Sequence, residues 1–181
     1  MSKAKSHYVD NKLFLTEMTQ YRLAVAKAKK LEEKKPQIPT YVAKCFMMIA
    51  ENLSHRPNFL SYTFRDEMIA DAIENCVMYV DNFDPAKSQN PFAYFTQIVY
   101  YAFLRRIQKE KSQLYIKYKA TESMGVLDEY GLNENEDGTF RQFELYENIS
   151  EFIDNYETAR KLKRKPTKTR FGDGENDPEL R

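Results

Sequence analysis

Apolar residues recur at three- and four-residue intervals along almost every long segment of this chain. Such spacing aligns the apolar side chains on one side of an α-helix. The 181 residues include only 5 Gly and 7 Pro, which are too few for the many tight turns of a sandwich or barrel. The sequence therefore predicts an all-α protein. The clearest repeat comprises Met68, Ile69, Ala72, Ile73, Cys76, Val77 and Val80.

Prolines and helix-capping residues divide this pattern into segments. Pro36 ends the first helix, because proline cannot continue one. Thr63 with Asp66 three residues later predicts an N-terminal cap, and Asn90 followed by Pro91 predicts another. The predicted helices are Asn11–Glu33, Tyr41–Leu53, Thr63 to the turn at Asp84-Pro85, Pro91 to about Lys119, and Thr139–Ala159.

These segments predict the organisation of the chain. We expect a compact helical domain over residues 8–120, an acidic loop over 121–138, an amphipathic helix over 139–160 and a flexible tail over 161–181. Cys45 and Cys76 fall inside apolar patterns, which indicates buried, unreactive thiols in a reducing cytoplasm. The apolar positions of the first helix are Leu13, Leu15, Met18, Tyr21, Leu23, Ala24 and Leu31.

Charge is segregated along the chain, although the formal net charge is only +1. The segment Tyr100–Lys119 carries a single acid, Glu110, among six basic residues, whereas Asp128–Glu157 has Arg141 as its only basic residue. This pattern indicates a basic contact surface beside an acidic segment, so nucleic acid is not excluded as a partner. No apolar run is long enough to span a bilayer, and we expect a cytosolic protein without a membrane partner.

The helix predicted from Pro91 has two distinct sides. The first is apolar and comprises Phe92, Phe95, Val99, Ala102, Phe103 and Ile107. The second comprises Tyr94, Gln97, Ile98, Tyr101, Arg105 and Gln108. If the second side is exposed, its aromatic rings and arginine suit unpaired bases next to phosphates. If two helices flank this one, both sides are core, and the spacing alone does not choose between these alternatives.

Residues Glu67–Lys111 resemble the helical module, called region 2, of bacterial sigma factors. The matching features are the Val80–Asp84 segment, the Phe92–Thr96 segment, Ala102 and Arg105-Arg106-Ile107. A closer resemblance, from about Tyr8 to the Thr139 helix, is to the divergent late-transcription sigma factors of T-even-type bacteriophages. It rests on the motifs IAE at Ile49–Glu51, EMIADAIE at Glu67–Glu74, NFD at Asn82–Asp84 and NPFAYFTQ at Asn90–Gln97.

The resemblance implies a sigma factor for phage late genes, acting in the cytoplasm of the infected bacterial host. It would bind the β′ coiled coil of the host RNA polymerase core through Glu67, Asp71, Glu74 and Asn75. Spacing alone favours a solvated face for these acids. A phage co-activator and a sliding clamp are further partners implied by the family.

The resemblance also implies that the protein recognises and melts a TATA-like, −10-type element of promoter DNA. The residues that would contact unpaired bases are Tyr94, Gln97, Ile98, Tyr100 and Tyr101. The residues that would hold phosphates are Lys87, Arg105, Arg106, Lys109 and Lys111.

The chain departs from this family in three respects. Primary sigma factors have two consecutive tryptophans where this chain has Gln97-Ile98, so unstacking would depend on Tyr94 and its neighbours. No second helix-turn-helix module follows, so recognition of a −35 element is not expected. The apolar motif that binds the sliding clamp in the late phage family has no equivalent in the terminal GDGENDPELR. The chain is truncated, or the clamp contact is lost or lies elsewhere.

Other functional classes have weaker support in the sequence. His7 and His55 lie in no metal-binding pattern, and the chain has no phosphate-binding glycine loop or nucleophile motif. We therefore expect no enzyme, no catalytic or metal site and no cofactor. The alternative function is a helical polymerase-binding adaptor, a co-activator or anti-sigma protein, that does not contact DNA. Burial of Tyr94, Gln97 and Tyr101 together would favour this alternative.

Overall fold

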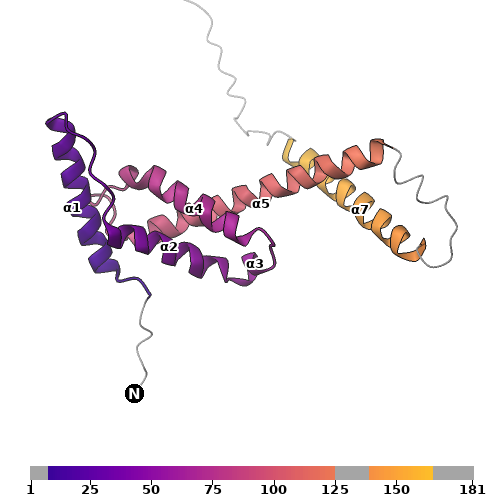
Figure 1. Ribbon diagram of the computed structural model, residues 1–181, viewed down its shortest axis with the longest axis horizontal. Helices are drawn as coiled ribbons and strands as arrows, with labels where there is room; N and C mark the ends of the chain where they lie inside the picture. Colours follow the sequence, from indigo (N-terminus) through magenta and orange to yellow (C-terminus); the bar gives the residue numbers. More distant parts are fainter. Residues whose placement is uncertain (1–7, 125–138, 165–181) are drawn as a thin grey trace, which may run out of the picture. The chain divides into compact units, whose positions relative to one another are not determined.

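A computed structural model describes residues 8–124 and 139–164, with the side chains of 8–124 and 147–162. Within these ranges there is no strand, so the prediction of an all-α protein is confirmed. None of the described helices is both long and apolar enough to cross a membrane. The elements are α1 (Asn11–Lys30), α2 (Thr40–Ser54), α3 (Pro57–Leu60), α4 (Arg65–Tyr79), the 3-10 turn η1 (Val80–Asn82), α5 (Pro91–Ser123) and α7 (Thr139–Arg164) (Figure 1).

The chain forms two compact units, residues 1–111 and 112–181. The boundary falls inside α5, which contributes its residues up to Lys111 to the first unit and the remainder to the second. The sequence placed the end of the helical domain at about residue 120. The expected loop over 121–138 is helical up to Ser123, and residues 125–138 lie outside the described ranges. The tail beyond residue 164 also lies outside them.

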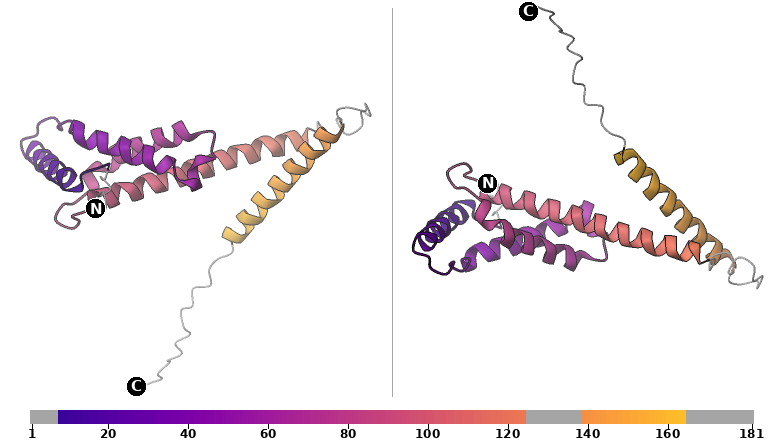
Figure 2. Two further views of the ribbon diagram at one scale, coloured as in Figure 1. Left: turned by 90° about the horizontal axis from the view of Figure 1, so that it is seen from below. Right: turned by 90° about the horizontal axis from the view of Figure 1, so that it is seen from above.

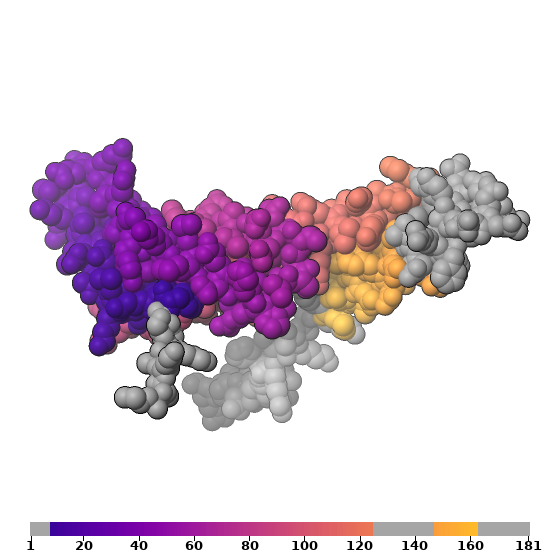
Figure 3. Space-filling view, turned by 60° about the horizontal axis from the view of Figure 1, so that its bottom comes forward, coloured from indigo at the N-terminus to yellow at the C-terminus, as the bar shows by residue number. Residues whose placement is uncertain are grey.

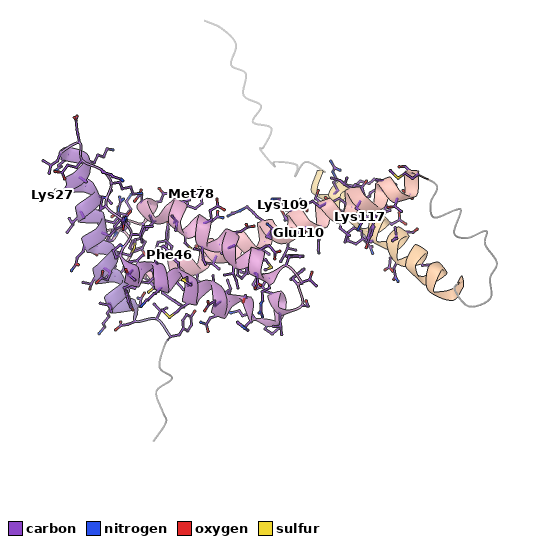
Figure 4. All side chains as sticks on the ribbon, viewed as in Figure 1. Lys27, Phe46, Met78, Lys109, Glu110 and Lys117 are labelled. Atoms are coloured by element: carbon purple, nitrogen blue, oxygen red, sulfur yellow. The ribbon has the colours of Figure 1, made fainter. Side chains whose placement is uncertain are left out.

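Phenylalanines from three helices form the centre of the first unit. Phe46 of α2 lies 4.5 Å from Phe95 of α5 between ring centroids, and Phe14 of α1 lies 5.6 Å from Phe95. Phe83, which follows η1, completes the group at 6.0 Å from Phe95. All four rings are buried, and Figure 4 shows Phe46 directed into the layer between the helices. Because aromatic rings bury large areas and prefer tilted contacts, this cluster fixes α1, α2 and the first half of α5 to one another.

The N-terminus of α5 is held by two asparagines. Asn90 Oδ1 accepts a hydrogen bond from the backbone N–H of Ala93 at 3.0 Å, which confirms the predicted cap. Asn11 Oδ1 of α1 accepts one from the N–H of Phe92 at 3.1 Å. The second bond comes from a distant part of the chain, so it fixes the start of α5 against α1 as well as satisfying a free amide.

An acidic residue after α4 contacts the middle of α1 and the segment that follows α1. Asp81 of η1 lies 2.6 Å from Lys35 Nζ and 3.8 Å from Arg22 of α1, and its Oδ1 accepts a hydrogen bond from Tyr21 O–H at 3.4 Å. The hydrogen bond to Asp81 raises the pKa of Lys35. Two of the basic residues in and after α1 are therefore committed to an internal contact.

Helix α1 buries only some of its apolar residues. Phe14, Met18, Tyr21 and Ala28 face the core, whereas Leu23 is 67 % exposed. Leu13 and Leu31 are also exposed, so three of the apolar positions noted in the sequence do not face the core. The physical reason is that α1 packs against the rest of the unit on one side only. Figure 2 shows α1 at the edge of the unit.

Two further expectations, both about α4, need correction. Thr63 does not cap α4: the helix begins at Arg65, and Phe64 occupies the cap position without a side-chain hydrogen bond. The ring of Phe64 instead packs on Tyr62 at 5.1 Å, which directs the chain into the helix. Val77 is exposed rather than part of the core. The short helix α3, with Pro57 at its first position, was not predicted.

The second unit brings the last part of α5 together with α7, both visible in Figure 3. Tyr115 stacks on Tyr156 at 4.5 Å, and Tyr118 meets the edge of Phe152 at 5.5 Å. Tyr115 O–H donates a hydrogen bond of 2.9 Å to Glu157. Aromatic side chains at i, i+3 and i+4 positions on the two helices therefore hold the unit together.

Both cysteines are buried and unpaired, as the sequence predicted. Burial raises the pKa of the Cys76 thiol to about 12. A thiol with so high a pKa holds almost no thiolate at neutral pH, and the thiolate is the reactive form.

Candidate nucleic-acid interface

The second side of α5 is largely open to solvent within the first unit. Gln97, Tyr100 and Arg105 are exposed, and Tyr101 is 50 % exposed. The condition that would have favoured an adaptor, burial of Tyr94, Gln97 and Tyr101 together, is therefore not met. A solvent-facing pair of tyrosines leaves apolar ring area in water, which usually marks a contact site.

Tyr94 and Ile98 differ from the other predicted base-contacting residues. Both are only partly exposed and pack against the core cluster. The Tyr94 ring lies 5.3 Å from Phe83 and 5.1 Å from Phe95, and burial raises the pKa of its phenol. Tyr94 therefore has one side fixed by the core, and less of its ring is available for stacking than in Tyr101.

A phenylalanine of helix α3 packs against one of the exposed tyrosines. The buried ring of Phe59 lies 5.7 Å from Tyr100 and 5.1 Å from Phe103 of the core, both in edge-to-face geometry. Tyr100 in turn lies 5.8 Å from Tyr101. Phe59 was not among the predicted site residues, because a four-residue helix leaves no periodic signal in the sequence.

A surface hollow of about 590 Å³ lies beside these tyrosines. Its volume is within the range of small-molecule sites, although it is open to solvent. Arg56 contributes the positive charge, at the end of α2, and it makes no ion pair with any described residue. The hollow is lined by Leu53, Arg56, Asn90, Phe92, Ala93, Thr96, Gln97, Tyr100 and Tyr101.

Arg56 is the main site residue that the sequence reasoning missed. It follows the second predicted helix and lies far along the chain from Tyr101, so only the packing of α2 on the rest of the unit brings the two together. The one available signal was the His55-Arg56-Pro57-Asn58 turn, which placed a cation at an exposed helix end. Nothing in that turn indicates its neighbours in space.

The predicted phosphate-binding residues fall into two groups. Lys109 and Lys111 are exposed on α5 (Lys109 is labelled in Figure 4), and Lys87 lies in the loop before α5 with only a 3.9 Å contact to Asp84. Arg105 is also exposed, and one of its terminal nitrogens donates a 2.6 Å hydrogen bond to Asn75. These four cations are accessible to a phosphate.

Arg106 belongs to the second group. Its side chain is 18 % exposed and lies 3.3 Å from Asp71 and 2.8 Å from Glu110. The contact between Arg106 Nε and Glu110 lacks hydrogen-bond alignment, so it is a charge contact. A partly buried charge has little contact with water and needs nearby partners. Asp71 of α4 and Glu110 of α5 are those partners for Arg106, so its side chain joins the two helices and has little freedom to reach a phosphate.

The predicted polymerase-binding residues also fall into two groups, exposed and half-buried. Glu67 and Glu74 are exposed on α4, with Asp66 in the first turn, and we call these three residues the acidic face. Asp71 is half-buried by its contact with Arg106, and Asn75 is half-buried by its bond to Arg105. The acidic face continues into exposed apolar side chains at Val77, Met78 and Tyr79.

Met78 is 60 % exposed and points away from the core in Figure 4. Carboxylates next to exposed apolar side chains form a surface suited to a basic, partly apolar protein partner. The first unit therefore carries two chemically different surfaces, the acidic face on α4 and the tyrosine-lined hollow on α5.

Among the described residues no group of three or more His, Cys, Asp and Glu side chains is arranged to hold a metal ion. Comparison with known proteins adds no identification. No protein-family model matches this chain, and no curated protein matches it.

Proposed function

We propose that this protein is a sigma factor of the phage late-transcription type, which binds the host core RNA polymerase and opens a TATA-like, −10-type promoter element. The observation that carries the proposal is the exposed Gln97, Tyr100, Tyr101 and Arg105 side of α5 over a hollow that contains Arg56. The sequence resemblance to region 2 of sigma factors covers this helix and α4. The resemblance implies polymerase as the partner of the acidic face and promoter DNA as the partner of the tyrosine-lined hollow.

The acidic face supports binding to the polymerase. In the family, this helix contacts basic residues of the β′ coiled coil. Glu67 and Glu74 form no ion pair with any described residue, so their charges are available to a partner. Val77, Met78 and Tyr79 add the apolar area that charged contacts alone lack.

The hollow supports capture of an unpaired base. A base that leaves the helix loses its stacking partners, and an exposed tyrosine can replace one at about 1–3 kcal/mol per base. Gln97 offers the amide that can pair with N6 and N7 of adenine, and Arg56 adds a cation to the lining of the hollow. Steps rich in A·T unstack at the least cost, which favours a TATA-like element for a reader without tryptophan.

Run-off transcription tests the proposal directly. Bacterial core polymerase is supplied with this protein on templates that carry A–T-rich, late-type promoters. We expect specific transcripts that depend on the protein and on the TATA-like element. Binding to core without promoter-specific transcripts, or without crosslinks from Tyr101 to DNA, would favour the polymerase-binding adaptor instead.

A charge-reversal variant separates the two surfaces. Glu67→Lys with Glu74→Lys is expected to abolish binding to core while the helical circular dichroism is retained. Asp71 is left intact, because its contact with Arg106 also holds α4 on α5. The matched control is Glu147→Lys with Glu151→Lys, which changes the net charge equally at exposed positions of α7. Normal transcription from the first variant would overturn the polymerase-binding surface.

A further inference from the structure

Asn75 lies on α4 between the acidic face and α5, and both ends of its side-chain amide are in use. Its Nδ2 donates a hydrogen bond of 2.6 Å to the backbone carbonyl of Asp71. Its Oδ1 accepts one of 2.6 Å from the guanidinium of Arg105. These two bonds use one of the two N–H donors and one of the two oxygen lone pairs of the amide. The bond to Arg105 ties Asn75 to α5, although the sequence resemblance assigned Asn75 to the polymerase contact.

Arg105 has the opposite character. A guanidinium has five N–H donors in a rigid fork, and a single bond to Asn75 leaves the others free. Arg105 is exposed and lies one helical turn after Tyr101. An arginine side chain has many rotamers, and their loss on binding lowers affinity. The bond to Asn75 restricts these rotamers before any ligand arrives.

We propose that Asn75 is a positioning residue for the nucleic-acid surface, holding Arg105 for the phosphate next to a base stacked on Tyr101. This inference rests on the proposed function and reassigns Asn75 from the polymerase surface to the DNA surface. Arg106, held by Asp71 and Glu110 on the same two helices, keeps α4 in register with α5 and so keeps Asn75 opposite Arg105.

The effect of removing Asn75 is separable from loss of fold. Asparagine is a weaker helix former than alanine, so Asn75→Ala favours the helical state of α4. Arg105 is exposed, so it loses no partner that it needs for burial. Asn52 is a matched control, because its Nδ2 makes the same type of bond, 2.8 Å to the carbonyl of Met48, and no hydrogen bond joins it to an arginine among the described residues.

The experiment uses the full chain with bacterial core polymerase and a fluorescent fork-junction DNA that carries the TATA-like element. Affinity for core and affinity of the complex for DNA are measured separately, the latter over a range of salt concentrations. We expect Asn75→Ala to leave core affinity unchanged and to weaken DNA binding about three- to tenfold. Asn52→Ala is expected to behave as wild type.

The salt dependence and a double variant identify the mechanism. Arg105→Ala should lower the slope of log affinity against log salt by about 0.7–0.9, the value of one phosphate contact. Asn75→Ala should lower it in the same direction, and the double variant should match Arg105→Ala alone, because the two side chains act as one unit. A purely structural role for Asn75 would leave this slope unchanged.

Three results would overturn the inference. The first is wild-type DNA binding by Asn75→Ala while Arg105→Ala is impaired. The second is a loss of core affinity in Asn75→Ala with unchanged DNA binding, which would return the residue to the polymerase surface. The third is tighter DNA binding by Asn75→Ala, which would show that the bond to Asn75 holds Arg105 away from the phosphate. Failure of the wild-type complex itself to bind promoter DNA would instead overturn the proposed function, and this inference with it.

Discussion

Arg105 and Arg106 are adjacent in the sequence and have opposite environments. Arg105 is exposed and makes one hydrogen bond to Asn75, whereas Arg106 lies between Asp71 and Glu110 with an 18 % exposed side chain. The pair of arginines was predictable as a basic feature of the helix. Their division between a contact surface and an internal ion pair was not, because it depends on which carboxylates α4 places opposite each one.

Replacement of these two arginines should therefore have different consequences for stability. Arg106→Ala is expected to destabilise the fold by about 1–3 kcal/mol, since it leaves two partly buried carboxylates without a cation. Arg105→Ala should change stability by less than about 0.5 kcal/mol, as is usual at exposed positions. Urea unfolding followed by circular dichroism measures both. Equal losses of stability would contradict the assignment of Arg106 to the interior.

Tyr101 and Arg56 should determine binding of melted DNA. Tyr101→Ala is expected to cost about 1–3 kcal/mol in affinity of the polymerase complex for single-stranded promoter DNA, because a stacking ring is lost. Tyr101→Phe keeps the ring and should keep most of the affinity. Arg56→Ala should weaken the same binding and reduce its salt dependence. The measurement is a fluorescence titration.

Glu32 occupies the left-handed backbone region with φ of 54° at the end of α1, where glycine is the preferred residue. Glu32→Gly is expected to raise the free energy of unfolding by up to about 1 kcal/mol, because a side chain is strained in this conformation. Glu33→Gly, at the next position, where φ is not positive, should give no gain. Thermal denaturation compares the two variants, and an equal gain from both would contradict the prediction.

At the scale of elements, the position of each helix was largely readable from the sequence. The helix starting at Pro91 and its cap at Asn90 follow from local rules that act within a few residues. The buried side of α1 could not be predicted from such local rules, because its leucines occur on both sides of the helix. Only the packing partner decides which of them are buried, and α1 packs on one side alone.

The contact between α1 and η1 should weaken at high pH. The pKa of Lys35 is raised from 10.5 mainly by its bond to Asp81, and that of Tyr21 from 10.0 mainly by burial. Protons held more tightly in the folded state stabilise it below the ordinary pKa values, and this contribution is lost as pH rises through the folded pKa values. We expect the denaturation midpoint to fall above about pH 10.

Asp81→Asn provides the control for that pH dependence. It removes the partner that raises the pKa of Lys35, so the fall in stability above about pH 10 should become shallower. Denaturation midpoints of both proteins across this range test the expectation. An unchanged pH profile in Asp81→Asn would show that the contact contributes nothing to the docking of α1.

At the scale of the whole molecule, charge distribution matters more than the net charge of +1. The acidic face lies on α4 and the accessible cations lie on α5 and the loop before it, so each group can meet a partner of opposite charge while the total stays near zero. Long-range attraction to DNA is therefore small for the free chain. The proposed function accordingly predicts that most of the affinity for a promoter depends on the polymerase complex.

The free protein is accordingly expected to bind duplex promoter DNA weakly, with little sequence preference. Addition of core polymerase should produce specific binding at the TATA-like element. Filter binding at two salt concentrations, with and without core, measures this difference. Tight, sequence-specific duplex binding by the isolated chain would contradict it.

The sequence by itself determined the helical class, the starts of most helices and the aromatic and basic composition of α5. These properties depend on local spacing, capping and propensity. The tertiary structure decided the side of α1 that is buried, the pairing of Arg106 with Asp71 and the placement of Arg56 and Tyr101 around one hollow. Each of these depends on contacts between residues that are distant in the chain, and no short-range pattern encodes which distant side chain the packing of helices will bring within reach.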